Sequence, residues 1–306
     1  MSELVDYISK DGAIYHFDSD DRFIYSIEGT GMPPIEYITQ KGPNQHGETL
    51  IDYRLGSRLV QVVMRQDTKS RFDYWLQRHH LLNYMRPNRA ATRTFGAGCL
   101  RHYLPDGSIR DLYAIINEGP VFSARNLDSW DEFGFSETLR FIAHDPIFYD
   151  PMRKSILWSV LIDDSALTDI EFPFEFPFTL GASAIALTKS ITYLGTWLAY
   201  PTITITGPAE GFTIYNLSTA EKIELDYSIA VGEIVQISLP YGNKRVRNTD
   251  DDNLIGTVTE DSNLSTFHVA PDPEVSGGVN TFTIAATGTS SASRVLLEYS
   301  EGYIGI

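Results

Sequence analysis

Residues 70–87 read SRFDYWLQRHHLLNYMRP, and this is the one segment of the chain with the clear pattern of an amphipathic helix. Ser70 and Asp73 form a capping box at its start, and Pro87 ends it because the residue before a proline avoids the helical region. Its apolar positions recur at spacings of three and four and therefore share one stripe. These positions are Phe72, Trp75, Leu76, His79, Leu82 and Met85. We expect this stripe, and Trp75 above all, to be buried against a sheet.

Strand patterns lie on both sides of this helix. Residues 60–65 alternate with a period of two, as a half-buried strand does. Residues 100–104 and 109–116 flank the turn sequence Pro105-Asp106-Gly107, which is a strong hairpin signal. One helix laid across antiparallel strands predicts an α+β first domain.

A further strand is predicted around residues 133–141, with an acidic residue on its apolar face. Phe133, Phe135, Leu139 and Phe141 share that face, and Glu137 interrupts it. Because burying a lone carboxylate is costly, we expect Glu137 to be paired or to lie near an edge of the sheet.

The pattern of predicted secondary structure changes after residues 144–146. From residue 196 onward short strands are separated by Gly- and Asn-rich turns, a pattern typical of a β-sandwich. We therefore divide the chain into a first domain over 1–150, a linker or arm over 151–195, and a second domain over 196–306. Residues 171–178 read EFPFEFPF. They form either an edge strand packed on its own domain or an arm that docks elsewhere, because two prolines bar the middle of a sheet.

Charge and composition exclude several classes of protein. The 24 Lys and Arg against 40 Asp and Glu give a net charge of −16, which argues against a surface that grips nucleic acid. The acidity serves solubility, or it lines a passage to which DNA does not stick. No apolar run reaches the ~18 residues of a membrane-spanning helix, and the acidic start lacks a signal-peptide pattern. We expect a chain made and folded in the cytoplasm, without a membrane partner.

The search for chemistry finds no catalytic pattern. The sequence has no phosphate loop, dinucleotide fingerprint, zinc-protease motif or hydrolase motif. His79 and His80 lack the i,i+4 spacing of a metal pair, and residues 250–252 are predicted to form a solvated turn rather than a calcium loop. The lone Cys99 cannot form an internal disulfide and is predicted to be a buried structural thiol. We predict no catalytic residue, no cofactor and no metal site.

The order of several short motifs resembles the siphophage tail-component family, and specifically its distal tail proteins. The similar segments are residues 31–38, 42–49, 60–64, 70–87, 105–108, 141–146, 195–197, 200–208, 214–216 and 231–233. They cover nearly the whole chain in order. No single one of them is diagnostic, so the resemblance depends on their succession.

This resemblance implies the fold class and the assembly. The first domain would be a tail-tube-like β-sandwich with one flanking helix that closes a homohexameric ring, and the second a peripheral galectin-like β-sandwich. The change in composition near residue 150 and the all-strand pattern after it indicate a separately folded second domain, which we expect to be dispensable for ring closure. The whole would be α+β, mainly β. The ring would sit in the virion at the tail tip or baseplate. Its partners would be the tail tube protein, the tail-tip or baseplate hub protein and a receptor-binding protein, and DNA would pass through its lumen without specific binding. The family has no catalytic residue to carry over.

Residues 31–49 are rich in Gly, Pro and Asn and lack periodicity, so we interpret them as a long loop or arm. Long stretches without regular structure in compact domains are usually functional. The candidate inter-subunit arm is carried by Gly42, Pro43, Gln45, His46 and Gly47. It reaches to a neighbouring subunit or adjacent ring, or else it packs on its own domain.

Three rival functions remain. A carbohydrate-binding module of a host-adsorption apparatus would use exposed aromatic residues of the second domain, for which Trp197, Tyr215 and Tyr241 are the candidates. The chain carries no large insertion in its C-terminal half of the kind that some members of the family use to bind sugars. A glycan-cleaving tail enzyme would need two carboxylates across a cleft. A major tube protein would polymerise into long tubes rather than stop at one or two rings.

Overall fold

The computed structural model describes residues 4–90, 93, 96–120, 134–159 and 185–306. The chain divides into two compact units. The first comprises Met1–Pro151 together with Tyr303–Ile306, and the second comprises Met152–Gly302. The chain therefore leaves the first unit once and returns to it with its last four residues.

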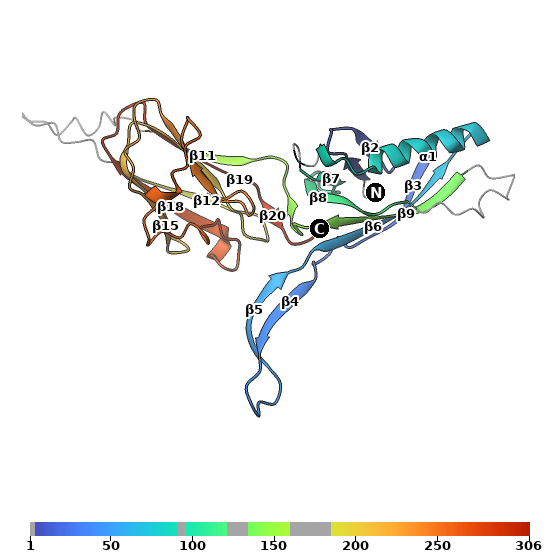
Figure 1. Ribbon diagram of the computed structural model, residues 1–306, viewed down its shortest axis with the longest axis horizontal. Helices are drawn as coiled ribbons and strands as arrows, with labels where there is room; N and C mark the ends of the chain where they lie inside the picture. The colour runs from blue at the N-terminus through green and yellow to red at the C-terminus, as the bar shows by residue number, and fades with distance from the viewer. Residues whose placement is uncertain (1–3, 91–92, 94–95, 121–133, 160–184) are drawn as a thin grey trace, which may run out of the picture. The chain divides into compact units, whose positions relative to one another are not determined.

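The first unit is built on an antiparallel sheet with the strand order β2-β1-β7-β8-β9-β6-β3 (Figure 1). These strands are β1 (Leu4–Ile8), β2 (Ile14–His16), β3 (Arg22–Glu28), β6 (Arg58–Asp67), β7 (Gly98–Tyr103), β8 (Ile109–Glu118) and β9 (Gly134–Ala143). The predicted strand around residues 60–65 is confirmed as β6, and the predicted hairpin is confirmed as the β7–β8 pair. Two short strands, β10 (Phe148–Tyr149) and β20 (Gly302–Tyr303), pair with each other beside β8.

The helix α1 (Arg71–Met85) begins and ends where the sequence predicts, and it lies along one side of the sheet (Figure 1). Ser70 is the N-cap: its Oγ accepts a hydrogen bond from the Asp73 amide at 3.1 Å. The Asp73 carboxylate in turn accepts from the Lys69 amide at 3.0 Å. Both bonds satisfy amides that have no partner within the helix.

The face of α1 that packs on the sheet is not the predicted one. Its buried residues are Tyr74, Leu81 and Met85, whereas Phe72, Trp75, Leu76, His79 and Leu82 of the predicted stripe are exposed. Of that stripe only Met85 is buried. The error has a simple physical cause: α1 is apolar on two sides, and three- and four-residue spacing reveals a stripe without telling which stripe meets the sheet.

Residues 31–49, interpreted above as an irregular loop, are largely a β-hairpin. β4 (Ile35–Gln40) pairs antiparallel with β5 (Thr49–Leu55), with a register shift between Ile38 and Thr39. This shift hides the period of two in the sequence. The two strands form a sheet of their own that projects from the first unit on the side away from α1 (Figure 1). We call residues 35–55 the arm.

The second unit is a β-sandwich. Its five-stranded sheet has the order β11-β19-β13-β16-β17, and its four-stranded sheet has the order β12-β18-β14-β15. The strands are β11 (Lys154–Ser159), β12 (Ile185–Thr192), β13 (Thr202–Thr206), β14 (Glu210–Asn216), β15 (Glu221–Leu225), β16 (Ile234–Ser238), β17 (Arg245–Arg247), β18 (Val279–Thr287) and β19 (Arg294–Tyr299). Two 3-10 turns, η3 (Ile255–Thr257) and η4 (Ser276–Gly278), lie in its connections. The predicted class, mainly β with one helix, is confirmed.

The segment predicted to be a linker contributes to this sandwich. β11 pairs with β19, and β12 pairs with β18, so both strands belong to the C-terminal sheets. The sequence did not reveal β11 and β12, because the strands with which they pair are not their neighbours in the chain. Residues 171–178 themselves lie outside the described residues. No described helix has the length and apolar character needed to cross a membrane.

Candidate assembly site

The five residues predicted to carry the arm all lie in the loop that joins β4 to β5. This loop is held by its own polar groups: the Gly42 amide donates to Gln45 Oε1 at 2.9 Å, and Gln45 Nε2 donates to Thr49 Oγ1 at 2.8 Å. Gly47 has a φ of 78°, which favours glycine. Pro43 and His46 are exposed at the tip. The tip is therefore an ordered turn that presents small and polar groups.

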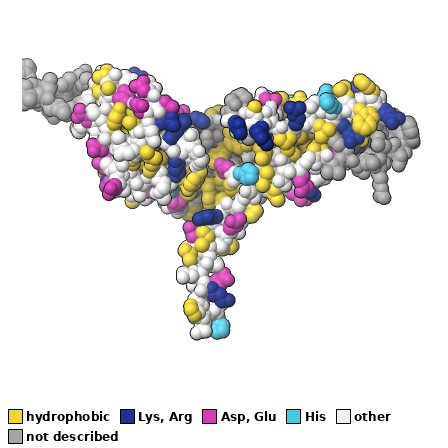
Figure 2. All heavy atoms as spheres, viewed as in Figure 1, with side chains coloured by type: hydrophobic (Ala, Val, Ile, Leu, Met, Phe, Trp, Pro, Cys, Tyr) yellow, Lys and Arg dark blue, Asp and Glu magenta, His cyan; other side chains and the backbone are white. Residues whose placement is uncertain are grey.

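The stem of the arm, which the sequence did not reveal, carries exposed apolar side chains. Tyr37 lies directly opposite Tyr53, and Thr39 lies opposite Leu50 on the same face. Tyr37, Leu50, Ile51 and Tyr53 are 62%, 59%, 60% and 49% exposed. Figure 2 shows hydrophobic side chains on the surface of this arm beside charged ones. We call Tyr37, Leu50 and Tyr53 the apolar face of the arm; the exposed Ile51 is the extra residue at the register shift beside it.

The opposite face of the arm is largely polar, and its one apolar member is Ile38, directly opposite Asp52. Glu36 and Arg54 face each other across the two strands, and Asp52 follows on the same side. An isolated two-stranded hairpin is only marginally stable in water, and one with a bare apolar face is less so. The arm thus has the build of an element that another surface covers.

The base of the arm is fixed by Arg58, at the start of β6. This side chain is 1% exposed and donates only to backbone carbonyls. Nε donates to Pro146 O at 2.8 Å, Nη1 to Gly29 O at 2.8 Å and also to Gly31 O, and Nη2 to Ile304 O at 2.6 Å. One guanidinium therefore joins the start of β6 to the segment between β3 and β4, to the segment after β9 and to the C-terminus.

The electrostatics of Arg58 are those of a buried cation held by dipoles. Its guanidinium lies 4.7 Å from the centre of the Phe148 ring, and no described carboxylate forms an ion pair with it. Burial lowers its pKa to about 10, so the group stays protonated at neutral pH. Four carbonyl oxygens thus replace the water that a charged side chain would otherwise need.

The C-terminal residues complete this anchor. The Ile306 amide donates to Thr30 O at 3.1 Å, and the guanidinium of Arg110 lies 3.7 Å from the centre of the Tyr303 ring. Gly29 must be glycine here, because its φ is +90° and an added Cβ would lie 2.0 Å from Leu59 O. The direction in which the arm leaves the sheet is therefore set by residues that are far apart in the sequence.

Two buried titratable groups of the first unit lack hydrogen bonds within the described part of the chain. Glu137 is 2% exposed and neither of its oxygens has a partner, so the predicted pairing is absent. Burial raises its pKa to about 7, against a smaller opposing effect of Arg78. The His102 ring is fully buried and without a partner, and burial lowers its pKa to about 4. Both groups are neutral in the core at mildly acidic pH.

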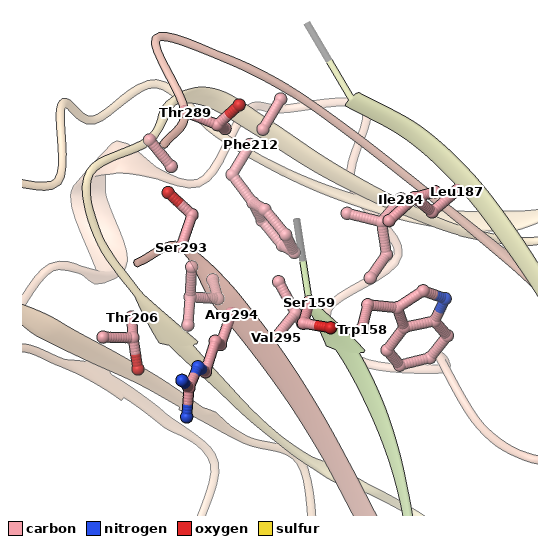
Figure 3. A pocket seen from close by; sticks show the side chains of 13 residues that line it. Trp158, Ser159, Leu187, Thr206, Phe212, Ile284, Thr289, Ser293, Arg294 and Val295 are labelled. Atoms are coloured by element: carbon pink, nitrogen blue, oxygen red, sulfur yellow. The ribbon is translucent and has the colours of Figure 1, made fainter. Parts of the chain in front are cut away.

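The second unit offers little that resembles a ligand site. A cavity between its sheets is lined by Trp158, Phe212 and Ile284 among others (Figure 3), and its volume of about 20 Å³ is space for roughly one water. Of the residues proposed to bind sugars, Trp197 is half-buried, Tyr215 lies on β14, and Tyr241 is exposed at the end of β16. No described contact brings these three together.

Other predicted features lie where expected. Cys99 is buried on β7, and burial raises the pKa of its thiol. Residues 250–252 form a tight turn in which Asn248 Oδ1 accepts from the Asp250 and Asp252 amides at 3.1 and 2.9 Å. Within the described residues no three His, Cys, Asp or Glu side chains are grouped so as to hold a metal ion.

Comparisons with known proteins agree with the geometry. Residues 194–303 match the family model of the siphovirus-type tail component, C-terminal domain. The crystal structure of the SPP1 Dit (gp 19.1) protein, described as a paradigm of hub adsorption apparatus in Gram-positive infecting phages, has a TM-score of 0.61 at 13% identity over 99% of each chain. A chain of the phage P2 baseplate in its activated conformation with Ca gives a TM-score of 0.45 at 9% identity, over 97% of this chain and 98% of that one. That score is too low to carry an argument.

No curated protein sequence matches the chain. The resemblance to siphophage distal tail proteins is nevertheless confirmed. In sequence it rests on residues 194–303, and in fold it extends over the whole chain.

Proposed function

We propose that this chain is a structural, non-enzymatic subunit of the virion that sits at the distal end of a siphophage tail, in the tail tip or baseplate. The observation that carries this proposal is the joint match of sequence and fold. Residues 194–303 fit the tail-component family, and 99% of the chain follows the fold of a phage hub protein. The chain would be made in the cytoplasm of the host cell and enter the virion at assembly.

The assembly that we propose is a closed homohexameric ring. An apolar arm that stays exposed in the described part of the chain supports this, because contacts between unlike surfaces of identical subunits generate rings when they close. Gly42, Pro43, Gln45, His46 and Gly47 would then form the tip that reaches a neighbouring subunit or the adjacent ring. The first unit would make the ring, and the sandwich of the second would lie at its periphery.

The ring would connect the tail tube protein to the tail-tip or baseplate hub protein, with a receptor-binding protein attached outside. DNA would pass through its lumen without specific binding. The net charge of −16 supports this last point, because carboxylates at the lumen wall repel phosphates over the ~8 Å that charges reach at physiological salt.

The test is to locate the protein in native particles. Gold-labelled antibody against the full chain is expected to mark one point at the distal end of the tail, and cryo-electron microscopy of that end is expected to show six copies around a channel. Label along the whole tail would identify a tube protein instead. Label at the head or absence from the particle would refute the proposal.

One observation favours carbohydrate binding as a second function. Tyr241 is 73% exposed, its hydroxyl accepts from the Tyr200 hydroxyl at 3.2 Å, and Lys244 Nζ lies 4.6 Å from its ring centre. Exposed aromatic rings beside hydrogen-bonding groups suit a sugar face. A glycan array should show binding that Tyr241→Ala abolishes and Tyr215→Ala preserves, and an array without binding would leave the scaffold role alone.

A further inference from the structure

The outward side of α1 is an apolar surface that stays exposed among the described residues of the first unit. Phe72, Trp75, Leu76 and Leu82 are 78%, 51%, 39% and 45% exposed, and three- and four-residue spacing places them in one row. We call these four residues the outer stripe of α1. Exposed Phe and Trp in a contiguous row are typical of a surface that another protein covers.

The outer stripe lies in the most basic part of the chain. Residues 69–93 contain six Lys or Arg and a single Asp, although the whole chain carries −16. Arg71, Arg86 and Arg89 are exposed, and the Arg78 guanidinium stacks 4.8 Å from the centre of the Trp75 ring. The rest of the chain is correspondingly acidic, so a second copy of the chain can supply a negatively charged surface that complements this basic region.

The apolar face of the arm matches the outer stripe in length and chemistry. A strand of six residues spans ~20 Å and a helix of fifteen residues spans ~22 Å. The outer stripe presents four exposed apolar side chains and the apolar face of the arm three, with aromatic residues in both. On the side of its apolar face the arm also carries Glu48, whose carboxylate accepts a hydrogen bond from Thr39 Oγ1 at 2.6 Å and offers an acidic group to the arginines of the helix. Tyr, Trp and Arg are the residues that contribute most to protein interfaces.

The two surfaces cannot meet within one chain. The arm leaves the first unit on the side away from α1, and its base is fixed there by the bonds of Arg58 to Gly29 and Gly31 (Figure 1). An arm and a helix of the same subunit therefore point apart, and each remains exposed unless a second copy covers it.

We propose that the apolar face of the arm of one subunit packs on the outer stripe of α1 of a second copy of this chain. The contact joins unlike surfaces, so each subunit gives one arm and receives another, and repetition closes a ring or links successive rings. A contact ~20 Å long covers less than the ~800 Å² per partner of a stable pair. It therefore acts together with other subunit contacts. The inference deepens the proposed ring by naming which surfaces meet.

The experiment places a photo-crosslinking amino acid in the arm of the full-length protein. Position Tyr53 lies on the apolar face, and its neighbour Arg54 lies on the polar face, so the two variants differ only in the direction of the probe. Isotope-labelled and unlabelled protein are mixed at ~1 mM, which populates contacts with millimolar dissociation constants, then irradiated and digested. Mass spectrometry separates crosslinks between copies from those within one copy.

We expect the Tyr53 probe to react with residues 71–86 of another copy and the Arg54 probe not to do so. Crosslinks from Tyr53 that map to any other segment or to the same copy would overturn the inference, and so would their absence. A paired substitution gives a second measure: Trp75→Gln should reduce the α1 crosslink at least tenfold, whereas His80→Gln, exposed but off the stripe, should leave it unchanged. The crosslinking experiment uses the isolated protein, so the absence of the crosslink would overturn this contact but not the proposed position in the tail tip. Antibody label at another place in the particle would overturn the proposed position but not this contact.

Discussion

Replacement of Arg58 by Met should destabilise the first unit by about 4 kcal/mol. Met preserves much of the side-chain volume but removes the guanidinium, so four backbone carbonyls lose their donor. At a net ~1 kcal/mol for each hydrogen bond, the loss is about 4 kcal/mol, within the ~3–5 kcal/mol found when one side of a buried charged network is removed. The loss is large because the carbonyls stay buried and unpaired.

Arg58→Lys should recover little of this stability. It retains the charge, but three donors on one atom cannot reach four carbonyls that come from three segments. Arg65→Met is the matched control on the same strand. Arg65 forms a partly exposed ion pair with Asp67 at 2.7 Å, and such pairs contribute at most ~1 kcal/mol.

The assay must resolve the two units, since a chain with two cores does not unfold in one step. Hydrogen exchange in increasing urea reports each unit separately, and the second unit serves as internal reference. In Arg58→Met the amides of residues 29–32 and 303–306 should exchange faster, together with the strands of the first unit. Stability within ~1 kcal/mol of wild type, with unchanged exchange at residues 303–306, would refute the anchoring role of Arg58.

Four further predictions follow from the same unit. The fold raises the pKa of Glu137 to about 7, so the stability that its protonated form contributes is fully present below about pH 4.5 and is lost as pH rises through 7. The wild-type protein should therefore lose about 3 kcal/mol of stability between pH 4.5 and 7, and Glu137→Gln should not show this loss. His102, whose pKa is lowered, contributes the opposite slope below pH 6.5, so the measure is the urea titration of the variant minus wild type, and identical profiles would contradict it. Trp75→Ala should cost less than ~1 kcal/mol in the same titration, because the ring is half exposed, and a loss of 3 kcal/mol would mean that it is buried. Deletion of Tyr303–Ile306 should lower the melting temperature of the first unit, because Arg58 and Thr30 lose hydrogen-bond partners. An unchanged calorimetric transition would show that these four residues do not stabilise the first unit. Ser70→Ala should cost ~1 kcal/mol by removing the cap of α1, and no change in urea midpoint would contradict that.

The C-terminal residues Tyr303–Ile306 also determine how the dispensability of the second unit for ring closure must be tested. A fragment of residues 1–152 lacks Tyr303–Ile306, which belong to the first unit. Such a fragment would leave Arg58 Nη2 without Ile304 O, so its instability would say nothing about the sandwich. A chain in which residues 152–302 are replaced by a short linker retains the anchor and isolates the contribution of the second unit to ring closure.

The sequence predicted the elements whose signals are local. The cap at Ser70, the stop at Pro87 and the turn at Pro105-Asp106-Gly107 each depend on residues within four positions of one another, and all three are present. The β11 and β12 strands were missed because their partners, β19 and β18, lie far away in the chain: Lys154 pairs with Tyr299, and Ile185 pairs with Ala286. Arg58 was missed for the same reason: its ligands come from residues 29, 31, 146 and 304, and no spacing in the sequence marks a buried guanidinium.

Two predictions were wrong, the buried face of α1 and the irregular loop at residues 31–49, and both have the same physical cause. In α1 and in the arm, apolar residues lie where the isolated chain has nothing to bury them, so rules that place apolar residues inside misassign them. A sequence that must cover surfaces in an oligomer carries two sets of apolar positions, one for its own core and one for its neighbours. In the proposed assembly the exposed Trp75 on α1 and Tyr37 on the arm would belong to the second set. Departures of this kind concentrate at functional surfaces, because local rules are kept elsewhere. The misplaced stripe and the misread loop are therefore the two surfaces on which assembly should depend.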